Sequence, residues 1–317
     1  MNILVTGGCG FIGSHFIRYM QKAYGGDSFI CLDALTYAGN KNNIADFLHR
    51  PWLTLAEGNI RDAVFVDTLF STYKPDVVIH FAAETHVDRS ITGPQVFLET
   101  NVIGTGVLLD ACLRYGIGRF HHVSTDEVYG ALPLDGGVPF TEESPLAPTS
   151  PYAASKASSD LLVLSYHKTY GLPVTISRCS NNYGTYQYPE KLIPLMIQRA
   201  LQDAPLPVYG DGLNVRDWIH VLDHCRAIDC ILQRGRVGEV YNVGAGEEIP
   251  NIELVKRILT ILGKPYELIT YVEDRLGHDR RYTIDSSKLE RLGWRPEYTM
   301  EDQLELIVQW YRKRLLR

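Results

Sequence analysis

The sequence has no C-x-x-C pair, no long basic run and no extended apolar segment, and each absence argues against a class of protein. The six cysteines are scattered through 317 residues, a pattern typical of reduced thiols rather than of a disulfide scaffold. Thirty-one basic against 37 acidic residues give a net charge of −6, which argues against a nucleic-acid binder. No apolar run approaches the length of a bilayer span, and the strand-like Met1–Val5 leaves no room for a signal peptide. We therefore expect a soluble cytoplasmic protein that does not contact a membrane.

The N-terminal half alternates short apolar segments with helix-length segments. The predicted strands are Ile3–Val5, Phe29–Leu32, Leu53–Leu55, Val77–His80 and Phe120–Val123, and the helices between them include Phe11–Ala23 and Val96–Tyr115. Parallel strands require crossover connections, and helices supply them. The alternation therefore predicts an α/β fold with a Rossmann-type, doubly wound parallel sheet.

The pattern changes near residue 181. Loops rich in glycine, proline and tyrosine (Asn181–Pro189, Pro205–Asn214 and Gly244–Pro250) alternate with helical segments such as Ile252–Leu262 and Met300–Leu315. We predict a Rossmann domain over residues 1–180, to which some later segments return. Residues 181–317 should mainly form a smaller α/β lobe, with substrate held between the two at the carboxyl edge of the sheet.

A glycine-rich turn follows the first predicted strand, with Gly7, Gly10 and Gly13 leading into an amphipathic helix. Such glycines allow a tight turn and close approach to a pyrophosphate, which the helix N-terminus attracts. Asp33 ends the second strand, twenty positions after Gly13, where a carboxylate binds ribose hydroxyls and repels a ribose phosphate. The arrangement predicts that the protein binds NAD. The glycine pattern could instead be an ordinary strand-to-helix turn, and Asp33 could be a surface acid. Asn59-Ile60 is either an adenine contact or a plain turn.

A tyrosine and a lysine share one helix face. Tyr152 and Lys156 are spaced i, i+4 in a helical pattern that Ser150-Pro151 would cap. A nearby ammonium lowers the pKa of a phenol, so that the phenol can take a proton from a hydroxyl while hydride leaves the same carbon. A pair on a solvated face has the same spacing.

Two adjacent acids follow the strand Phe120–Val123. The segment Thr125-Asp126-Glu127 puts one hydroxyl and two carboxylates at the carboxyl end of the sheet. Repulsion and burial would raise one pKa and leave one acid and one base. An exposed loop pair or a helix cap is the alternative, but the dinucleotide motif and the Tyr/Lys pair favour catalysis.

At these residues the sequence resembles the extended short-chain dehydrogenase/reductase family, and within it the dTDP-glucose 4,6-dehydratases. The similar stretches are GGCGFIG (7–13), LDALTYAGN (32–40), HFAAETHVDRS (80–90), STDEVYG (124–130), SPYAASKA (150–157), RCSNNYG (178–184), YPEKLIP (188–194), YGDGLNVRDW (209–218) and DRLGHDRRY (274–282). They cover nearly the whole chain. Thr-Asp-Glu is the most specific element, since related epimerases usually carry a serine with small residues there.

The resemblance implies a dehydration in which a nucleoside-diphosphate glucose, dTDP-glucose before any other, becomes a 4-keto-6-deoxy sugar. Tyr152, with Thr125 and Lys156, would deprotonate the C4 hydroxyl while NAD takes hydride. Glu127 would remove the C5 proton, Asp126 would protonate the departing C6 hydroxyl, and hydride would return to C6. Family members commonly form homodimers, and the apolar helix around Val102–Leu113 would be partly core and partly subunit contact.

The resemblance also implies two sets of binding residues. The NAD set is Gly7, Gly10, Phe11, Ile12, Gly13, Asp33, Thr36, Asn59, Ile60, Ala82, Ala83, Thr100, Tyr152, Lys156 and Asn182. The sugar-nucleotide set is Thr85, Asn181, Lys191, Leu192, Pro207, Tyr209, Arg216, Asn251 and His278. Arg216 is the best phosphate candidate, with a surface salt bridge to Asp217 or Asp211 as the alternative. Asn251 reads equally well as a helix N-cap, and His278 as a solvated loop histidine.

Three positions depart from the family pattern. Thr85 replaces the usual serine, Asn59 an aspartate and Thr185 a proline. Only the Asn59 replacement weakens an assignment, that of the adenine contact.

His220 and His224 are spaced i, i+4 but have no third metal ligand, so we expect no metal. We expect structural roles for His121 and His122.

The rival functions are a nucleotide-sugar 4-epimerase, which needs no acid–base pair for elimination, and a non-catalytic NAD-binding sensor.

Overall fold

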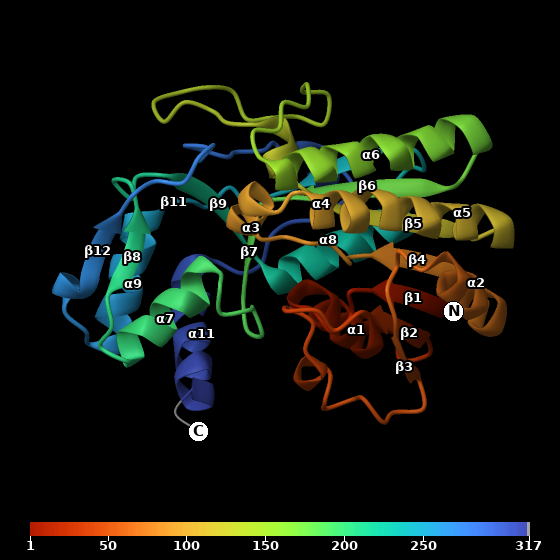
Figure 1. Cartoon of the computed structure of the whole chain (residues 1–317), viewed down its shortest axis with the longest axis horizontal. Coiled ribbons are helices and arrows are strands. Elements are labelled where there is room, and N and C mark those ends of the chain that lie inside the picture. The colour runs from red at the N-terminus through yellow and green to blue at the C-terminus, as the bar shows by residue number, and fades with distance from the viewer. Residues whose placement is uncertain (316–317) are drawn as a thin grey trace.

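The computed structural model describes residues 1–315, and a seven-stranded parallel sheet forms its centre (Figure 1). The strand order is β10-β6-β5-β4-β1-β2-β3. The strands are β1 (Asn2–Thr6), β2 (Ser28–Asp33), β3 (Leu53–Glu57), β4 (Val77–His80), β5 (Arg119–Thr125), β6 (Val174–Cys179) and β10 (Val240–Val243). The order reverses at β1, which opens a crevice at the carboxyl edge. The predicted doubly wound parallel sheet is confirmed.

Helices cover both faces of this sheet (Figure 1). On one face α1 (Phe11–Tyr24) packs against α8 (Val221–Arg234), over a core that includes Phe16 and Ile228. On the other face lie α2 (Ala63–Tyr73), α5 (Thr105–Tyr115) and α6 (Pro151–Tyr170), over a separate core. Both faces are therefore dry, which is why the strands read as continuous apolar runs.

The helix predicted over Val96–Tyr115 is divided in the structure. It consists of α4 (Gln95–Phe97), a π-helical segment η2 (Leu98–Gly104) and α5. By length and composition the stretch Gln95–Tyr115 could cross a membrane, which the sequence analysis did not expect. Its buried residues Leu108, Leu109 and Cys112 belong to the core against α2, and buried core helices pass the same test.

A second group of elements, called the second lobe below, lies to the left of the large sheet in Figure 1. It contains a three-stranded sheet, β7 (Asn181–Tyr183), β9 (Val215–His220) and β11 (Glu248–Pro250), and a pair, β8 (Leu206–Tyr209) and β12 (Ile269–Val272). The helices α7 (Leu192–Leu201), α9 (Asn251–Leu262) and α11 (Met300–Leu315) pack into their own core. Shorter elements are η1 (Lys41–Asn43), α3 (Val87–Thr92), η3 (Asp126–Tyr129), η4 (Tyr266–Leu268) and α10 (Ser287–Glu290).

Three of these strands fall in segments that were predicted to be loops. β7, β8 and β11 have only three or four residues each, too few for an alternating pattern to show. The predicted domain boundary near residue 181 stays a prediction. The later elements α8 and β10 lie on the large sheet, because β10 pairs with β6 in parallel.

Candidate active site

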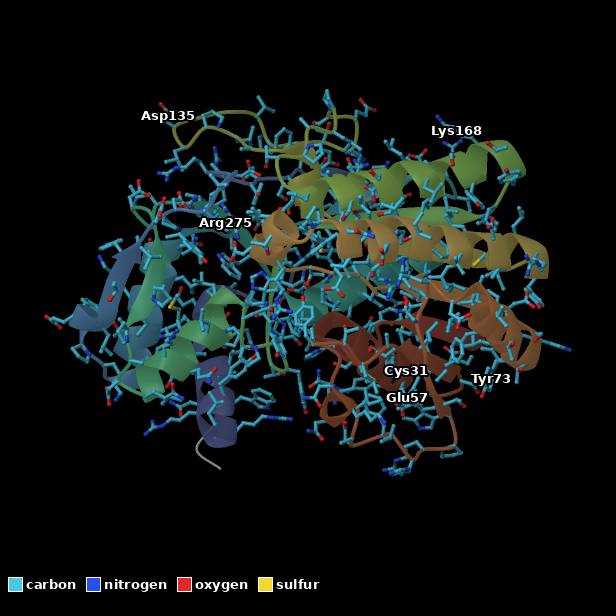
Figure 2. The ribbon with its side chains drawn as sticks, in the orientation of Figure 1. Cys31, Glu57, Tyr73, Asp135, Lys168 and Arg275 are labelled. Carbon is cyan, nitrogen blue, oxygen red and sulfur yellow. The ribbon has the colours of Figure 1, made fainter. Side chains whose placement is uncertain are left out.

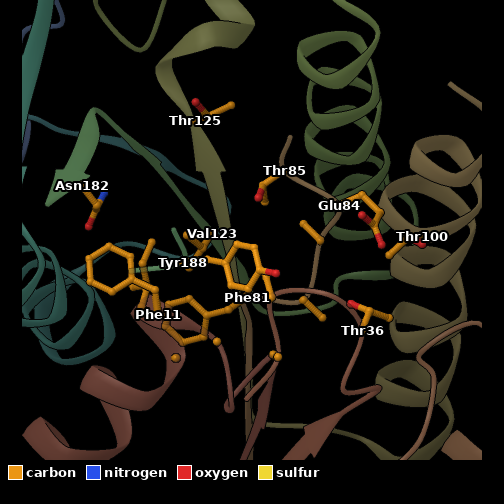
Figure 3. A pocket seen from close by; sticks show the side chains of 18 of the residues that line it. Phe11, Thr36, Phe81, Glu84, Thr85, Thr100, Val123, Thr125, Asn182 and Tyr188 are labelled. Carbon is orange, nitrogen blue, oxygen red and sulfur yellow. The ribbon is translucent and has the colours of Figure 1, made fainter. Parts of the chain in front are cut away.

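A cavity of about 420 Å³ opens at the carboxyl edge of the large sheet (Figure 3). It lies where β1, β4 and β5 end and where β7 and α7 of the second lobe begin. Every cofactor and catalytic position from the sequence analysis lines it: Gly7, Gly10, Phe11, Ile12, Gly13, Asp33, Thr36, Asn59, Ile60, Ala82, Ala83, Thr100, Thr125, Asp126, Glu127, Tyr152, Lys156 and Asn182. Segments that are far apart in sequence thus meet at one site.

The glycine-rich turn has the shape that a pyrophosphate requires. Gly7 has a φ of 69°, in the left-handed region. A Cβ on Gly13 would lie 2.4 Å from the carbonyl oxygen of Gly7, so no side chain fits between helix α1 and the turn. Gly10 caps α1 without a side-chain hydrogen bond, which leaves the first N–H groups of the helix free for an anion. These observations fit a dinucleotide.

Asp33 connects the end of β2 to this turn. Its Oδ2 accepts a hydrogen bond from the backbone N–H of Cys9 at 2.9 Å, and its Oδ1 accepts one from Leu35 at 2.8 Å. Burial raises the pKa of this carboxyl, and the two N–H donors oppose the rise. The carboxylate is thus fixed by the turn and also lines the cavity, as a ribose-binding acid requires.

Thr125 is the last residue of β5 and also caps the short turn η3. Its hydroxyl oxygen accepts a hydrogen bond from the N–H of Glu127 and donates to Oδ1 of Asp126 at 3.2 Å. Figure 3 shows Thr125 at the end of its strand, facing the cavity. The local sequence therefore positions both acids beside one hydroxyl.

The environments of the two acids differ. Asp126 is buried, and burial followed by repulsion from Glu127 and Asp217 raises its pKa well above the usual range. Glu127 is half-buried; burial raises its pKa, but the cations of Arg275, Arg216 and Lys191 oppose the rise. This difference supplies a protonated acid next to a more readily ionised carboxylate, which is the division expected from sequence.

Tyr152 and Lys156 lie in the first two turns of α6. The Ser150 side chain accepts from the N–H of Ala153 and Pro151 begins the helix, as predicted. The phenol of Tyr152 is buried, and burial together with the Glu127 charge raises its pKa well above the usual value. The lowering that was expected from Lys156 does not appear, because burial and the nearby acidic groups raise the pKa. The nearby Thr125 hydroxyl acts in the opposite direction and lowers the pKa of the phenol.

Lys156 is buried beneath the cavity. Its ammonium donates to the carbonyl oxygen of Val123 at 2.8 Å, which fixes the side chain against β5. Burial lowers its pKa to about 8, and the charge of Asp160 opposes this fall.

The sugar-nucleotide positions divide into two groups. Thr85, Asn181, Lys191 and Leu192 line the cavity, whereas Pro207, Tyr209, Arg216, Asn251 and His278 do not. Within the first group the Lys191 ammonium donates to the carbonyl oxygen of Thr85 at 2.9 Å and thereby joins α7 to the segment after β4. Burial lowers the pKa of Lys191.

Arg216 is buried rather than part of a surface salt bridge. Its guanidinium lies 4.4 Å above the ring of Tyr282 and donates to the carbonyl oxygen of Asp279 at 2.9 Å. Asp211 instead pairs with Arg280. Figure 2 places the nearby Arg275 at the junction between the lobes, beside α3 and β9. The cationic groups opposite Glu127 thus come from the second lobe.

The remaining positions lie on the rim or in the second lobe. Asn251 is the first residue of α9, and Pro250 occupies the cap without a side-chain bond, so Asn251 is not the N-cap. The His278 imidazole pairs with Asp274 and packs edge-on against Tyr209, so its side chain is not a solvated one.

Several cavity residues were missed by sequence reasoning. Tyr37, Arg61, Glu84, Tyr188 and Glu190 line the cavity. Figure 3 shows Tyr188 opposite Phe81 in its centre, with Glu84 and Thr85 on adjoining chain. Glu84 and Glu190 stand next to Thr85 and Lys191, so the same similar stretches carried a signal for them. Tyr37 also stands next to a predicted residue, Thr36, but its contacts with Arg89 and Tyr188 depend on how the loop folds.

His224 of the set-aside histidine pair contacts Asn182, a cavity residue. Among residues 1–315 no group of three histidine, cysteine or acidic side chains is arranged to hold a metal ion. His220 instead caps α8, accepting from the N–H of Leu222.

The chain matches the family model described as GDP-mannose 4,6-dehydratase over residues 4–307. It is 53% identical over 311 residues to the low-salt glycan biosynthesis protein Agl12 of Haloferax volcanii, covering 98% of each chain. It is also 53% identical over 327 residues to dTDP-glucose 4,6-dehydratase of Xanthomonas campestris, covering 97% of this chain and 92% of the relative.

Solved structures agree. The DesIV dTDP-glucose 4,6-dehydratase of Streptomyces venezuelae, crystallised with NAD and dTDP, superposes with a TM-score of 0.95 at 52% identity. The match covers 99% of this chain and 97% of that one. A UDP-glucose 4-epimerase of Thermotoga maritima reaches a TM-score of 0.92 at 33% identity, covering 99% of this chain and 100% of that one. The fold alone therefore does not separate the two reactions, and the Asp126–Glu127 pair has to do so. From the match of the family model and these identities, the chain belongs to the GDP-mannose 4,6-dehydratase family.

Proposed function

We propose that the chain is an NAD-dependent dehydratase that converts dTDP-glucose into its 4-keto-6-deoxy derivative. The observation that carries this proposal is the pair Asp126 and Glu127, which share one cavity with Tyr152 and have pKa values raised to different extents. An elimination needs an acid for the leaving hydroxyl and a base for the neighbouring proton, both in reach of one sugar ring.

NAD would be held by the glycine-rich turn, by Asp33 and by the other cofactor positions along the cavity floor. The chemistry that it supplies when bound is reversible hydride transfer, out of C4 and back to C6. The site recovers its starting redox state in each turnover, so we expect NAD to stay bound between turnovers.

The side chains of this protein would move the protons. Tyr152 takes the proton of the C4 hydroxyl, and the positive charges of Lys156 and of bound NAD favour the phenolate that this step requires. Once C4 is a carbonyl, the C5 proton is acidic and Glu127 removes it. Asp126 protonates the C6 hydroxyl, which leaves as water. Glu127 then returns its proton to C5.

This sequence leaves one proton out of place. Glu127 gives back the proton that it took, but Tyr152 has gained one and Asp126 has lost one. Thr125 donates to Asp126 at 3.2 Å and lies close enough to Tyr152 to lower the pKa of its phenol, so its hydroxyl would pass the proton and restore both groups. Thr125 therefore has two tasks in the proposed cycle, holding the C4 hydroxyl and connecting the two acid–base groups.

We assign the sugar nucleotide to the side of the cavity formed by Thr85, Asn181, Lys191 and Leu192. Pro207, Tyr209, Arg216, Asn251 and His278 do not line the cavity, and we assign them to the nucleoside diphosphate end. Arg216 and Arg275 supply positive charge on that side, which suits a pyrophosphate.

The experiment is a turnover assay with dTDP-, UDP-, GDP- and CDP-glucose, read by mass spectrometry. We expect a product lighter by one water molecule, formed fastest from dTDP-glucose. A product of unchanged mass would identify a 4-epimerase, and NAD binding without turnover would identify a sensor protein. Faster conversion of another nucleotide sugar would overturn the base assignment and leave the dehydration intact.

We further propose that two copies of the chain associate through α5 and α6. Exposed apolar side chains gather on these helices and on η2, among them Ile103 at 60%, Leu161 at 59% and Tyr170 at 57% exposure. A monomer that exposes such a face pays a solvation cost that a partner removes. Ile103→Asp with Leu161→Asp should give a monomer in sedimentation velocity; an unchanged dimer would place the interface elsewhere.

The division into a cofactor domain over residues 1–180 and a mainly substrate-binding lobe over 181–317 belongs to the same proposal. So does a cytoplasmic location, which is compatible with six cysteines that are all free thiols.

A further inference from the structure

The histidine pair on β5 was expected to be structural, and the structure gives its two members different surroundings. His121 faces hydroxyl groups, those of Thr175 at 3.0 Å and Ser177 at 3.1 Å. His122 points to the opposite side of the sheet, toward α6. There its Nε2 lies 3.4 Å from the ammonium nitrogen of Lys156.

Two further groups of α6 approach the same nitrogen of His122. The hydroxyl oxygen of Ser159 is 3.2 Å away, and Oδ1 of Asp160 is 3.5 Å away. The Ser159 hydroxyl already donates to the carbonyl oxygen of Lys156 at 2.8 Å. All of these side chains are buried, so water does not separate them from one another.

The charge of Lys156 decides what the His122 ring can do. Because an ammonium only donates hydrogen bonds, we assign the lone pair to the nitrogen that faces it and the ring proton to Nδ1. In the described part of the chain Nδ1 of His122 has no hydrogen-bond partner. Buried polar atoms are rarely left in this state. In this tautomer Nδ1 of the ring makes no hydrogen bond among the described residues, whereas Nε2 accepts one from Lys156.

Asp160 completes the arrangement on the Nε2 side of the ring, the side that faces Lys156. Its Oδ2 accepts from the Nε of Arg178 at 2.8 Å, whereas Oδ1, the oxygen nearer to His122, has no hydrogen-bond partner within residues 1–315. Arg178 holds the carboxylate in place, and the free oxygen directs negative charge toward the His122 and Lys156 pair.

We propose that His122, supported by Asp160, is a positioning residue that keeps the Lys156 ammonium charged and directed toward Tyr152. His122 does not touch the reacting atoms and acts only through Lys156. The proposal rests on the proposed function only in the use to which the ammonium is put, and it goes beyond that function by naming what maintains the charge.

The pH behaviour follows from every charged group around the pair. His80 of β4 faces the His122 ring at 5.2 Å but is itself held between the hydroxyls of Thr6 and Thr105. Burial lowers the pKa of His122 well below the usual value, and the nearby cations Lys156 and Arg178 lower it further. His122 therefore stays neutral and remains an acceptor. For Lys156, burial lowers the pKa to about 8, while Asp160 and Cys179 raise it.

The test is a direct titration of Lys156 in the enzyme without sugar nucleotide. In protein labelled with ¹³C at the lysine ε-carbons, the Lys156 signal is assigned by its disappearance in Lys156→Met. His122→Phe removes the acceptor and should lower the midpoint by about one to two pH units, the shift worth one hydrogen bond to a charged group. His122→Asn restores an acceptor oxygen and should return the midpoint toward that of the wild type.

His121→Phe is the matched control, since it removes an equally buried histidine from the same strand without a contact to Lys156. An unshifted midpoint in folded His122→Phe would overturn the proposal, as would an equal shift in His121→Phe. If His122→Phe does not fold, His122→Val tests the same loss with a residue that suits a strand. A second measurement is the rate of C4 oxidation as a function of pH, followed by the absorbance of reduced nicotinamide. The alkaline limb of this pH profile should shift together with the titration midpoint of Lys156. A shifted midpoint without dehydration of dTDP-glucose would leave this inference standing and remove the proposed function.

Discussion

The Nδ1 of His224 lies 2.9 Å from the side-chain oxygen of Asn182, and this bond fixes which way the Asn182 amide faces. The amide nitrogen donates to the carbonyl oxygen of Ser180 at 3.0 Å, so His224 must be the donor to the amide oxygen. A buried histidine of α8 therefore orients a residue that lines the cofactor cavity.

Replacing His224 by leucine removes that donor. We expect NAD affinity to fall about tenfold, because an amide oxygen left without its buried partner lets Asn182 rotate. Calorimetric titration of NAD-free enzyme measures the change. His220→Asn, one turn earlier, keeps a capping acceptor for Leu222 and should bind NAD as the wild type does. Unaltered affinity in folded His224→Leu would contradict the orienting role.

Replacing Glu127 by glutamine should separate oxidation from elimination. The amide cannot take the C5 proton, so reduced nicotinamide should accumulate in a first turnover while product formation falls by at least about a hundredfold. Rapid-mixing absorbance and exchange of C5 hydrogen with solvent deuterium follow the two steps. Glu143→Gln, an exposed acid in the loop after η3, should change neither. Full product formation by Glu127→Gln would remove the residue from the mechanism.

Replacing Asp126 by asparagine should stabilise the protein while it stops dehydration. The pKa of Asp126 in the folded protein is raised by burial, so the native state binds this proton more tightly than the unfolded state does. Stability contributed by the protonated form is then lost as pH rises from the ordinary carboxyl value through the raised one. Asparagine cannot ionise, so we expect a gain of at least about 1 kcal/mol at pH values above the raised pKa and little change in acid.

Urea unfolding across pH measures this difference. Asp211→Asn is a control of opposite sign, because the hydrogen bond from Arg280 lowers the pKa of Asp211 to about 2. Its substitution should destabilise the protein at neutral pH. A flat pH dependence in the Asp126→Asn comparison would mean that Asp126 ionises normally and is not the acid.

Replacing Gly13 by alanine should abolish NAD binding. The new methyl group would lie 2.4 Å from the carbonyl oxygen of Gly7, so either the turn or helix α1 must shift away from the pyrophosphate position. We expect affinity to fall by more than about a hundredfold, measured by cofactor retention on gel filtration. Gly26→Ala, where the nearest atom is 3.8 Å away, should retain NAD.

The sequence predicted those parts of the protein that are encoded locally. The strands at Ile3, Phe29 and Val77, the turn at Gly7 and the cap at Ser150 all depend on neighbouring residues, and the structure has each of them. Because parallel strands end at one edge, the meeting of Thr125 with the glycine-rich turn followed as well.

Other features depend on contacts between distant segments and had no local pattern. The burial of Arg216, which was predicted as a phosphate ligand or a surface salt bridge, depends on the segment around Asp279 that contacts it. The strand β7 exists only because β9 pairs with it. The difference between His121 and His122 arises from which side of the sheet α6 covers, and alternation shows only that they point apart.

The return of α8 and β10 to the large sheet has a consequence for dissection of the chain. A fragment ending at residue 180 would lack the strand that completes β6 and the helix that covers α1, leaving Phe16 and Ile17 open to water. Such a fragment should aggregate rather than bind nucleotide. A chimera meant to change the accepted sugar should therefore exchange α7, β8, α9 and β12 as separate inserts, and retain Val221–Arg234 and Val240–Val243 from the host.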